Sequence, residues 1–448
     1  MSLPDLSAAK AWLAGRSPQQ RKQLGQWPTP FDLCCAVIER VAQRLPKRPR
    51  IVDPACGDGR WLVAAAAECP DAELWGIDLD PTALDAANAT LRRAGVTATL
   101  HQADALLDDV VPECDAVVGN PPYVRPQHLN RDVALALWRR FPAVTDKCDL
   151  SACFVELACE RADRMAFVLG RSMLSLRSFA ALRSRVLGFG LNGAFAVPDR
   201  TFEAAVRTFV LELGPEDERL AGAYRPSKGQ RSAALEVTGT LGISREAWSL
   251  DGPPPELPGT PLGDVARFHM GVVCGDYARY VHQGPPGPLD EPTCRGRDVS
   301  RFRIADRGEW LHYDPTDMLA RKPYVAPKSR EIFDVAEKIV VAGTTGRRIV
   351  AAMDERRRFP LDSCYVVHSR PDIDLWAVLG WLASPVVGAW YAARFGAPRV
   401  KAIELAGIPL PPQDYWGELG AAVREQDEPA IDRMTRAAVS AMRFIARS

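Results

Sequence analysis

The stretch Arg50-Ile-Val-Asp-Pro-Ala-Cys-Gly-Asp-Gly-Arg60 joins a short apolar strand to a turn that carries two glycines. Apolar runs and helix-like segments alternate from this point to residue 119. Strands are expected at 50–53, 73–80, 97–104 and 115–119, and helices at 61–69 and 81–94. Because the connections are short, this alternation predicts an α/β fold with a doubly wound, mostly parallel sheet.

The glycine turn at residues 55–59 matches neither common nucleotide fingerprint. It lacks the third glycine of a G-x-G-x-x-G turn and the Lys-Ser/Thr of a phosphate-binding loop. Asp53, just before the turn, would repel a pyrophosphate but would suit a cationic ligand. Asp78 ends the next strand, where a carboxylate can accept both hydroxyls of a ribose. A ligand with a ribose and a cationic amino-acid end but no phosphate fits, and S-adenosylmethionine is such a ligand.

A third acid, Asp104, ends the third expected strand. From there it could accept a hydrogen bond from the amino group of the cofactor's adenine. Each acid taken singly is more often a solvated loop carboxylate. Three acids at the ends of three successive strands favour a binding site instead.

The fourth strand runs into Asn120-Pro121-Pro122-Tyr123. Two prolines cannot continue a sheet, because neither has an N–H to donate and each fixes φ. The chain must therefore leave the sheet at Asn120 and present an amide and a phenol at the carboxyl edge, where ligands bind in open α/β sheets. An Asn-Pro pair alone usually marks only a turn, but the acidic cofactor turn upstream favours a site.

Composition bounds the remaining possibilities. The chain has 448 residues, 47% hydrophobic and 25% charged, so two globular domains are expected. The formal net charge is zero, so nucleic-acid binding would need a local basic face. Neither the eleven cysteines nor the six histidines show zinc-ligand spacing, so we expect no metal and a reducing cytoplasm. The N-terminus shows no signal-peptide pattern.

One uncharged run, at residues 375–393, is long enough to raise the question of a membrane span. Gly380, Pro385 and Gly388 interrupt this run, and Ser384-Pro385 resembles a helix start. The run therefore predicts two short buried helices, and no membrane partner is expected.

The proline-rich segment at 252–261 is the clearest domain boundary. We expect a catalytic domain at 1–245, a linker at 246–262 and a second domain at 263–448 that ends in helices. Within it, residues 338–353 are expected to form a hairpin. Residues 321–358 carry ten Lys/Arg against five Asp/Glu, a surplus that suits a phosphate backbone, although such runs are often only solvated faces.

Three motifs in this order carry a family resemblance: Gly-Gln-Trp-Pro-Thr-Pro at 25–30, the turn after Asp53, and Asn-Pro-Pro-Tyr at 120–123. The chain resembles the amino-methyltransferases of bacterial restriction–modification systems, and best the gamma-class, Taq-type adenine-N6 DNA methyltransferases. The resemblance implies a Rossmann-like S-adenosylmethionine-dependent methyltransferase fold with a C-terminal mixed α+β DNA-recognition domain. It further implies methyl transfer to the N6 amino group of an adenine flipped out of double-stranded DNA.

The resemblance also implies roles for individual residues. Asn120 and the Pro121 carbonyl would each accept an amino N–H of the adenine, and Pro122 would stiffen them. The aromatic rings of Tyr123 and Phe202 would stack on the flipped base. The expected cofactor site comprises Trp27, Thr29, Pro30, Asp53, Pro54, Ala55, Cys56, Gly57, Gly59, Asp78, Leu79, Asp104, Ala105, Asn120 and Phe154. The expected DNA contacts are Arg297, Thr345, Arg347 and Arg348.

Several alternatives stay open. Amino methylation of cytosine is one, although such enzymes more often have Ser in place of Asn120. A ring-carbon cytosine methyltransferase would need a Pro-Cys loop, which is absent. Release-factor glutamine methyltransferases share Asn-Pro-Pro-Tyr but lack a large C-terminal domain. A non-enzymatic specificity protein would not need the acids and Asn120. We expect a monomer in the bacterial cytoplasm, with any partner restriction endonuclease encoded separately.

Overall fold

The protein divides into two compact units, Met1–Pro253 and Pro254–Ser448, and each is described by itself. This division lies within the segment 246–262 that the sequence marks as a linker. The computed structural model describes residues 5–17, 27–124, 129–145, 147–199, 201–202, 207–227, 232–243, 248–250, 252, 257–322, 324–344, 348–395 and 400–445.

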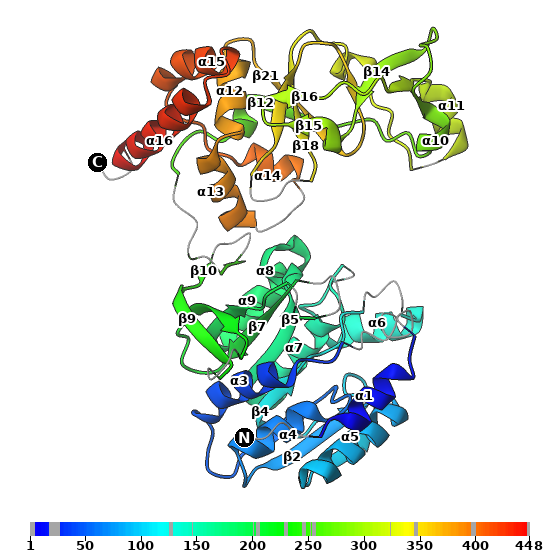
Figure 1. The fold of residues 1–448 in the computed structure, drawn as a ribbon, viewed down its shortest axis with the longest axis vertical. Helices are drawn as coiled ribbons and strands as arrows, with labels where there is room; N and C mark the ends of the chain where they lie inside the picture. The colour runs from blue at the N-terminus through cyan, green and yellow to red at the C-terminus, as the bar shows by residue number, and fades with distance from the viewer. Residues whose placement is uncertain are drawn as a thin grey trace. The chain divides into compact units, whose positions relative to one another are not determined.

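A nine-stranded sheet forms the centre of the first unit (Figure 1). Its strand order is β3-β2-β1-β4-β5-β7-β6-β8-β9, and the pairs from β3 to β5 are all parallel. The predicted doubly wound, mostly parallel sheet is therefore confirmed. The strands are β1 Arg50–Asp53, β2 Glu73–Asp78, β3 Thr99–Gln102, β4 Cys114–Gly119, β5 Ala162–Gly170, β6 Leu191–Ala196, β7 Thr208–Leu213, β8 Leu220–Arg225 and β9 Ala234–Thr240.

Strand order reverses between β1 and β4, which lie side by side although two strands separate them in the chain. In open α/β sheets such a switch point opens a crevice at the carboxyl ends of the strands, where ligands bind. Asp53 is the last residue of β1, and Asn120 directly follows β4. The topology therefore brings the two most informative residues of the sequence to the same crevice.

The sheet is buried on both faces. Val117 packs into the core that α7 (Ser151–Arg161) and α9 (Ala180–Phe189) cover, whereas its neighbour Val118 packs into the core under α3 (Phe31–Ala42) and α4 (Arg60–Glu68). Successive side chains of a strand point to opposite faces, so a strand covered on both sides reads as one apolar run. This explains why polar and apolar residues do not alternate along the sequence of β4.

Two helices start close to the crevice because of specific residues at their ends. Gly59 precedes α4 with a φ of 78°, and a Cβ there would lie 3.1 Å from the Cβ of Ala87 in α5 (Pro81–Ala94). A glycine is needed for both reasons. Asp80 caps α5 by accepting the N–H of Thr82, with Pro81 in the first helical position. Both helices thus begin at the carboxyl edge of the sheet.

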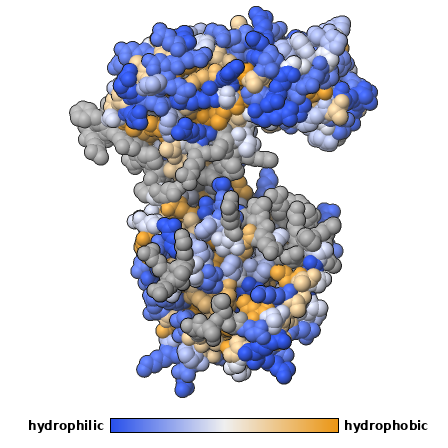
Figure 2. All heavy atoms as spheres, in the orientation of Figure 1, coloured by the Kyte–Doolittle hydropathy of each residue, from blue (hydrophilic) through white to orange (hydrophobic). Residues whose placement is uncertain are grey.

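The second unit mixes small sheets with helices. One four-stranded sheet has the order β12-β21-β18-β19, another the order β13-β17-β14-β20, and β15 pairs with β16. Figure 2 shows hydrophilic side chains over most of the visible face of this unit. The strands are β12 Ala266–Met270, β13 Val281–His282, β14 Asp290–Cys294, β15 Val299–Ser300, β16 Arg303–Ile304, β17 Trp310–His312, β18 Lys338–Ala342, β19 Ala351–Asp354, β20 Phe359–Pro360 and β21 Cys364–Ser369. The α-helices are α10 Tyr277–Tyr280, α11 Pro315–Arg321, α12 Leu375–Leu382, α13 Pro385–Phe395, α14 Ala402–Ala406, α15 Trp416–Arg424 and α16 Glu428–Ile445.

The predicted hairpin and the apolar run both have clear outcomes in the second unit. Strands β18 and β19 pair antiparallel, so the hairpin is confirmed, while its tip, with Thr345 and Arg347, lies outside the described residues. The run 375–393 forms α12 and α13, which bend by 61° relative to each other and contribute Leu379, Trp381 and Trp390 to the core. The prediction of two short buried helices is also confirmed. Within the described ranges, no single helix is long and apolar enough to cross a membrane.

Candidate active site

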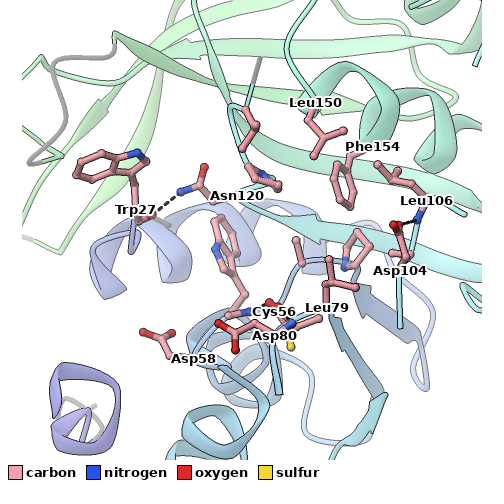
Figure 3. A pocket seen from close by; sticks show the side chains of 18 of the residues that line it. Trp27, Cys56, Asp58, Leu79, Asp80, Asp104, Leu106, Asn120, Leu150 and Phe154 are labelled. Carbon is pink, nitrogen blue, oxygen red and sulfur yellow. Dashed lines mark hydrogen bonds between the residues drawn. The ribbon is translucent and has the colours of Figure 1, made fainter. Parts of the chain in front are cut away.

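A cavity of about 660 Å³ lies at the carboxyl ends of the strands β1 to β4 (Figure 3). Most of the predicted cofactor residues line it, although they come from six separate segments. Those lining it are Trp27, Thr29, Pro54, Ala55, Cys56, Gly57, Asp78, Leu79, Asp104, Ala105, Asn120 and Phe154, together with Pro122. Pro30, Asp53, Gly59, Pro121, Tyr123 and Phe202 are not among the lining residues.

Asp53 directly precedes Pro54, which lines the cavity, and is itself completely buried. Its Oδ1 accepts the N–H of Ala55 at 3.1 Å, but its Oδ2 has no hydrogen-bond partner among the described residues. Burial raises the pKa of this carboxyl well above its usual range, and the nearby Asp78 and Asp58 raise it further. A buried acid with an unsatisfied oxygen is stabilised by a cationic ligand, which fits the amino-acid end of S-adenosylmethionine.

Gly119 lets the backbone of β4 approach Asp53. A Cβ at this position would lie 2.7 Å from Asp53 Oδ1, and the glycine has a φ of 150°. A side chain here would push Asp53 aside or displace the start of the Asn120 segment. The glycine before Asn120 is therefore a packing requirement of the crevice.

Asp78 anchors the glycine turn to the end of β2. Its Oδ2 accepts the N–H of Gly57 at 2.8 Å and its Oδ1 accepts the N–H of Asp80 at 2.9 Å. Burial raises the pKa of the Asp78 carboxyl. The carboxylate lines the cavity, as a partner of ribose hydroxyls must.

The part of the cavity next to Asp104 is apolar. Leu79, Leu106, Leu150 and Phe154 line it (Figure 3), and Leu79 is 68% exposed although it is a leucine. Asp104 Oδ1 accepts the N–H of Leu106 at 2.9 Å. Apolar walls beside a carboxylate suit a flat heteroaromatic ring with an amino substituent, such as adenine.

Asn120 has a fixed amide orientation. Its Nδ2 donates to the Trp27 carbonyl at 2.8 Å (Figure 3), and its Oδ1 accepts from the Tyr123 hydroxyl at 2.5 Å. Because a carbonyl only accepts, the Trp27 oxygen determines which end of the amide is nitrogen. The second lone pair of Oδ1 can still accept another N–H.

Tyr123 is tied to the sheet by its hydroxyl. The hydroxyl lies 2.9 Å from the Val168 carbonyl of β5 as well as 2.5 Å from Asn120 Oδ1. Burial raises the pKa of this hydroxyl well above its usual value. Tyr123 thus fixes the far side of the Asn120 amide, a contact that the sequence did not reveal.

Phe202 lies apart from the cavity. It packs, half-buried, against the core that contains Val118, Val197 and Val210. Residues 200 and 203–206 beside it lie outside the described residues. Stacking of Phe202 on a flipped base therefore stays a prediction.

The sequence reasoning missed the wall that α1 (Ser7–Ala14) and the residues after it add to the cavity. Trp12 Nε1 donates to Thr82 Oγ1 at 3.0 Å, and the Arg16 guanidinium binds Asp80 and Thr82 Oγ1. Both residues line the cavity. These contacts join residues more than sixty positions apart, so no local pattern could predict them. Further lining residues that were missed are Pro28, Asp58, Arg60, Trp61, Asp80, Ala103, Leu106, Val124, Leu129, Val133, Leu137 and Leu150.

The predicted DNA contacts lie in the second unit. Arg297 is exposed, but its guanidinium pairs with Glu309, which Arg295 also contacts at 3.0 Å. Arg348 is exposed, and Thr345 and Arg347 lie outside the described residues. Of the nine basic residues at 321–358 that the structure describes, six form ion pairs with carboxylates: Arg321, Arg330, Lys338, Arg356, Arg357 and Arg358.

The basic surplus of residues 321–358 is therefore partly neutralised by acids from elsewhere in the chain. Arg321 pairs with Asp317, Arg330 with Glu291 and Arg356 with Asp306, all outside the counted window. Charge counting along the sequence could not include these partners. Among the described residues, no group of three or more His, Cys, Asp or Glu side chains is arranged to hold a metal ion.

Family models match three parts of the chain. The model of the TaqI-like C-terminal specificity domain matches residues 291–410, and that of the Eco57I restriction-modification methylase matches 112–188. The model of the methyltransferase small domain matches residues 35–144. Together they cover both units, and the small-domain match includes the cavity's acids.

Comparison with curated proteins gives matches over most of the chain. The type II methyltransferase M.XamI of Xanthomonas campestris pv. amaranthicola is 38% identical over 383 residues, which cover 77% of this chain and 67% of that protein. The type II methyltransferase M.TthHB8I of Thermus thermophilus is 25% identical over 353 residues, which cover 75% of this chain and 78% of that protein.

A shorter match is to the release factor glutamine methyltransferase of Mycobacterium leprae, which is 41% identical over 88 residues. It covers 19% of this chain and 30% of that protein, far less than the matches to the type II enzymes. The matched methyltransferase domain and the type II methyltransferase relatives confirm S-adenosylmethionine as the cofactor. With both units matched and a relative aligned over two thirds of its own length, the chain belongs to the type II methyltransferases of restriction–modification systems.

Proposed function

We propose that this protein transfers a methyl group to the N6 amino group of an adenine flipped out of double-stranded DNA, at one recognised sequence. The observation that carries the proposal is the position of Asn120. It follows β4 at the switch point, beside the cavity, with its amide oriented by the Trp27 carbonyl. An oriented amide next to a sulfonium site is what methylation of an amino group requires.

When bound, the cofactor supplies an electrophilic methyl group on its sulfur. Residues in and next to the cavity offer a partner for each part of the cofactor. Asp53 would hold the cationic amino-acid end, and Asp78 would accept the ribose hydroxyls. Asp104 would accept from the adenine amino group, with Leu79 and Phe154 along the ring. The lining of the cavity supports the roles of Asp78, Asp104, Leu79 and Phe154. The role of Asp53, which does not line the cavity, is supported by its burial and by its unsatisfied Oδ2.

The acceptor needs orientation more than a strong base. The lone pair of an adenine amino group is delocalised into the ring, so the nitrogen is a poor nucleophile. Asn120 Oδ1 and the Pro121 carbonyl would each accept one N–H, which holds the lone pair toward the methyl group. The same two oxygens stabilise the positive charge that develops on the nitrogen. The N–H becomes acidic once the nitrogen is methylated, so it can be lost afterwards.

Base flipping costs a few kcal/mol, and stacking on aromatic rings can return about 1–3 kcal/mol per base. Tyr123 is the ring next to Asn120, and Phe202 is proposed as the second. The hydroxyl of Tyr123 is bound to the sheet and to Asn120. The rings of Tyr123 and Phe202 would together hold the flipped base by stacking on it.

Two other acceptors are ranked below adenine. Cytosine N4 uses the same amino chemistry, but Asn at position 120 and the TaqI-like specificity domain favour adenine. A glutamine amide of a release factor is supported by alignments of 88 and 170 residues, each of which leaves most of the chain unmatched. A separately encoded restriction endonuclease that cuts the same sequence is the proposed partner, and the protein is proposed to act as a monomer in the bacterial cytoplasm.

The experiment that tests the proposal is methylation-sensitive sequencing of host DNA with and without the gene. N6-methyladenine at one recurring sequence, present only with the gene, is the expected result. If N4-methylcytosine is found instead, the acceptor is the amino group of cytosine, and the protein is still a DNA amino-methyltransferase. Unmodified DNA in both hosts would overturn the proposal.

Arg348 gives a testable prediction for DNA binding. We expect Arg348→Ala to weaken binding to every sequence about equally and to make the plot of log affinity against log salt shallower by about 0.9, the loss of one phosphate contact. The matched control is Arg357→Ala, because Arg357 is exposed too but pairs with Asp334 at 3.0 Å. Filter binding across a salt series measures both slopes, and equal slopes for Arg348→Ala and wild type would remove Arg348 from the interface.

A further inference from the structure

The segment Trp27-Pro28-Thr29-Pro30, called the strap below, connects the cofactor turn with the catalytic amide. The Trp27 carbonyl accepts from Asn120 Nδ2 at 2.8 Å. Two residues further, the Thr29 carbonyl accepts from Nη1 of Arg60. The strap thus binds Asn120 through the Trp27 carbonyl and Arg60, the first residue of α4, through the Thr29 carbonyl.

The strap is stiff, so a shift at Thr29 also moves the Trp27 carbonyl that binds Asn120. Pro28 and Pro30 fix their own φ angles and restrict the residues before them. The Pro30 carbonyl accepts the N–H groups of Leu33 and Cys34, which fastens the strap to α3. The Trp27 and Thr29 carbonyls are therefore held in a nearly fixed relation to each other.

Arg60 can bind the strap only because its guanidinium is itself fixed. Nε donates to Asp58 Oδ1 at 2.8 Å and Nη2 binds Asp58 Oδ2, which leaves Nη1 directed at Thr29. The side chains of Arg60 and Asp58 are only 12% and 6% exposed. A planar fork with three separate donors suits this arrangement, and a lysine could not form it.

We propose that Arg60 is a positioning residue for methyl transfer, which acts through the strap on the orientation of Asn120. The inference rests on the proposed function, because it assigns Arg60 to the same amide. Two simpler roles compete with it. Arg60 could be only a buried ion pair that stabilises the fold, or it could bind the cofactor directly, since it lines the cavity.

The test compares two double variants that each remove a buried arginine fork together with its carboxylate. Arg60→Met with Asp58→Asn removes the tether and leaves no unpaired charge. Arg40→Met with Glu212→Gln is the control, because Arg40 forms a similar fork on Glu212, at 2.9 and 3.0 Å, in the same unit. Arg40 makes no hydrogen bond to the strap among the described contacts.

We expect the Arg60/Asp58 variant to lose about 100-fold in kcat, the effect of misplacing a reacting group by roughly 1 Å, with little change in KM for the cofactor. The Arg40/Glu212 variant should keep the wild-type kcat. Equal kcat values for the two variants would overturn the inference. A rise in the cofactor KM with unchanged kcat would also overturn it, in favour of direct cofactor binding.

A second measurement asks whether Arg60 acts through Asn120. In an Asn120→Ser background the amide nitrogen that binds Trp27 is gone, so adding the Arg60/Asp58 changes should lower the residual kcat no further. A further loss of about 100-fold in this background would overturn the inference. The proposed function fails separately, if host DNA carries no methylated amino group that depends on the gene, and this result is distinct from either outcome for Arg60.

Discussion

Replacement of Asn120 by alanine is expected to abolish methyl transfer while cofactor binding survives. The variant keeps the buried acids and loses the whole amide: the oxygen proposed to orient the amino group and the nitrogen that binds the Trp27 carbonyl. Loss of one such preorganised group costs about 10²–10³ in kcat, and loss of orientation adds to it. Transfer of tritiated methyl groups to DNA measures the activity, and calorimetry with S-adenosylmethionine measures binding.

Asn130→Ala is the matched control for this experiment. Asn130 caps α6 (Arg131–Arg140) by accepting the N–H of Asp132 at 2.8 Å and does not line the cavity. Its loss should cost about 1 kcal/mol of stability and leave kcat unchanged. Retained transfer in Asn120→Ala would contradict the proposed role of the amide.

Asp53→Asn is expected to have opposite effects on cofactor binding and on stability. The variant should lose most of its affinity for S-adenosylmethionine, because it lacks the ionisable carboxyl proposed to hold the cationic end. The cofactor-free protein should become more stable at neutral pH, because Asp53 is buried with Oδ2 unsatisfied. Asparagine can still accept the N–H of Ala55 in the same place.

The pH dependence gives the sign of this stability effect. Burial raises the folded-state pKa of Asp53 above its usual value of 3.8. Between those two pKa values the folded state holds more protons than the unfolded state, so this carboxyl lowers stability as the pH rises through that window. Asp53→Asn removes this loss, and the gap in melting temperature between variant and wild type should widen from pH 4 upward.

Melting curves across pH, with and without cofactor, measure both effects of Asp53→Asn. Asp115→Asn serves as the control, since Asp115 lies near the opposite end of β4, where it accepts the N–H of Arg50. The control should bind the cofactor as wild type does. Unchanged cofactor affinity in Asp53→Asn would show that the buried carboxylate does not face the bound ligand.

The main strands of the first unit could be predicted from local features of the sequence. The apolar runs and the glycine turn depend on residues close together in the chain, so β1, β2 and β4 and the strand-end positions of Asp53 and Asn120 could be predicted. The parallel order then follows from the short connections. The second and third strands are shorter than expected, at Glu73–Asp78 and Thr99–Gln102. The pairing of β2 with β3 ends at Asp78 and Gln102, and Asp80 instead caps α5.

Contacts between distant segments could not be predicted in the same way. The binding of Asn120 to Trp27 and of Tyr123 to Val168 depends on how the strap and β5 pack beside β4. The neutralisation of the basic run depends on acids at 291, 306 and 317 that fold back onto it. In both cases the partner is chosen by tertiary packing, which a local pattern does not encode.

The most direct test of the account is nucleoside analysis of DNA methylated in vitro by the purified enzyme. Unmethylated genomic DNA is incubated with isotopically labelled S-adenosylmethionine, digested to nucleosides and analysed by mass spectrometry. We expect labelled N6-methyldeoxyadenosine with wild type and none with Asn120→Ala. Label in 5-methyldeoxycytidine, or a DNA product that persists undiminished in Asn120→Ala, would contradict it.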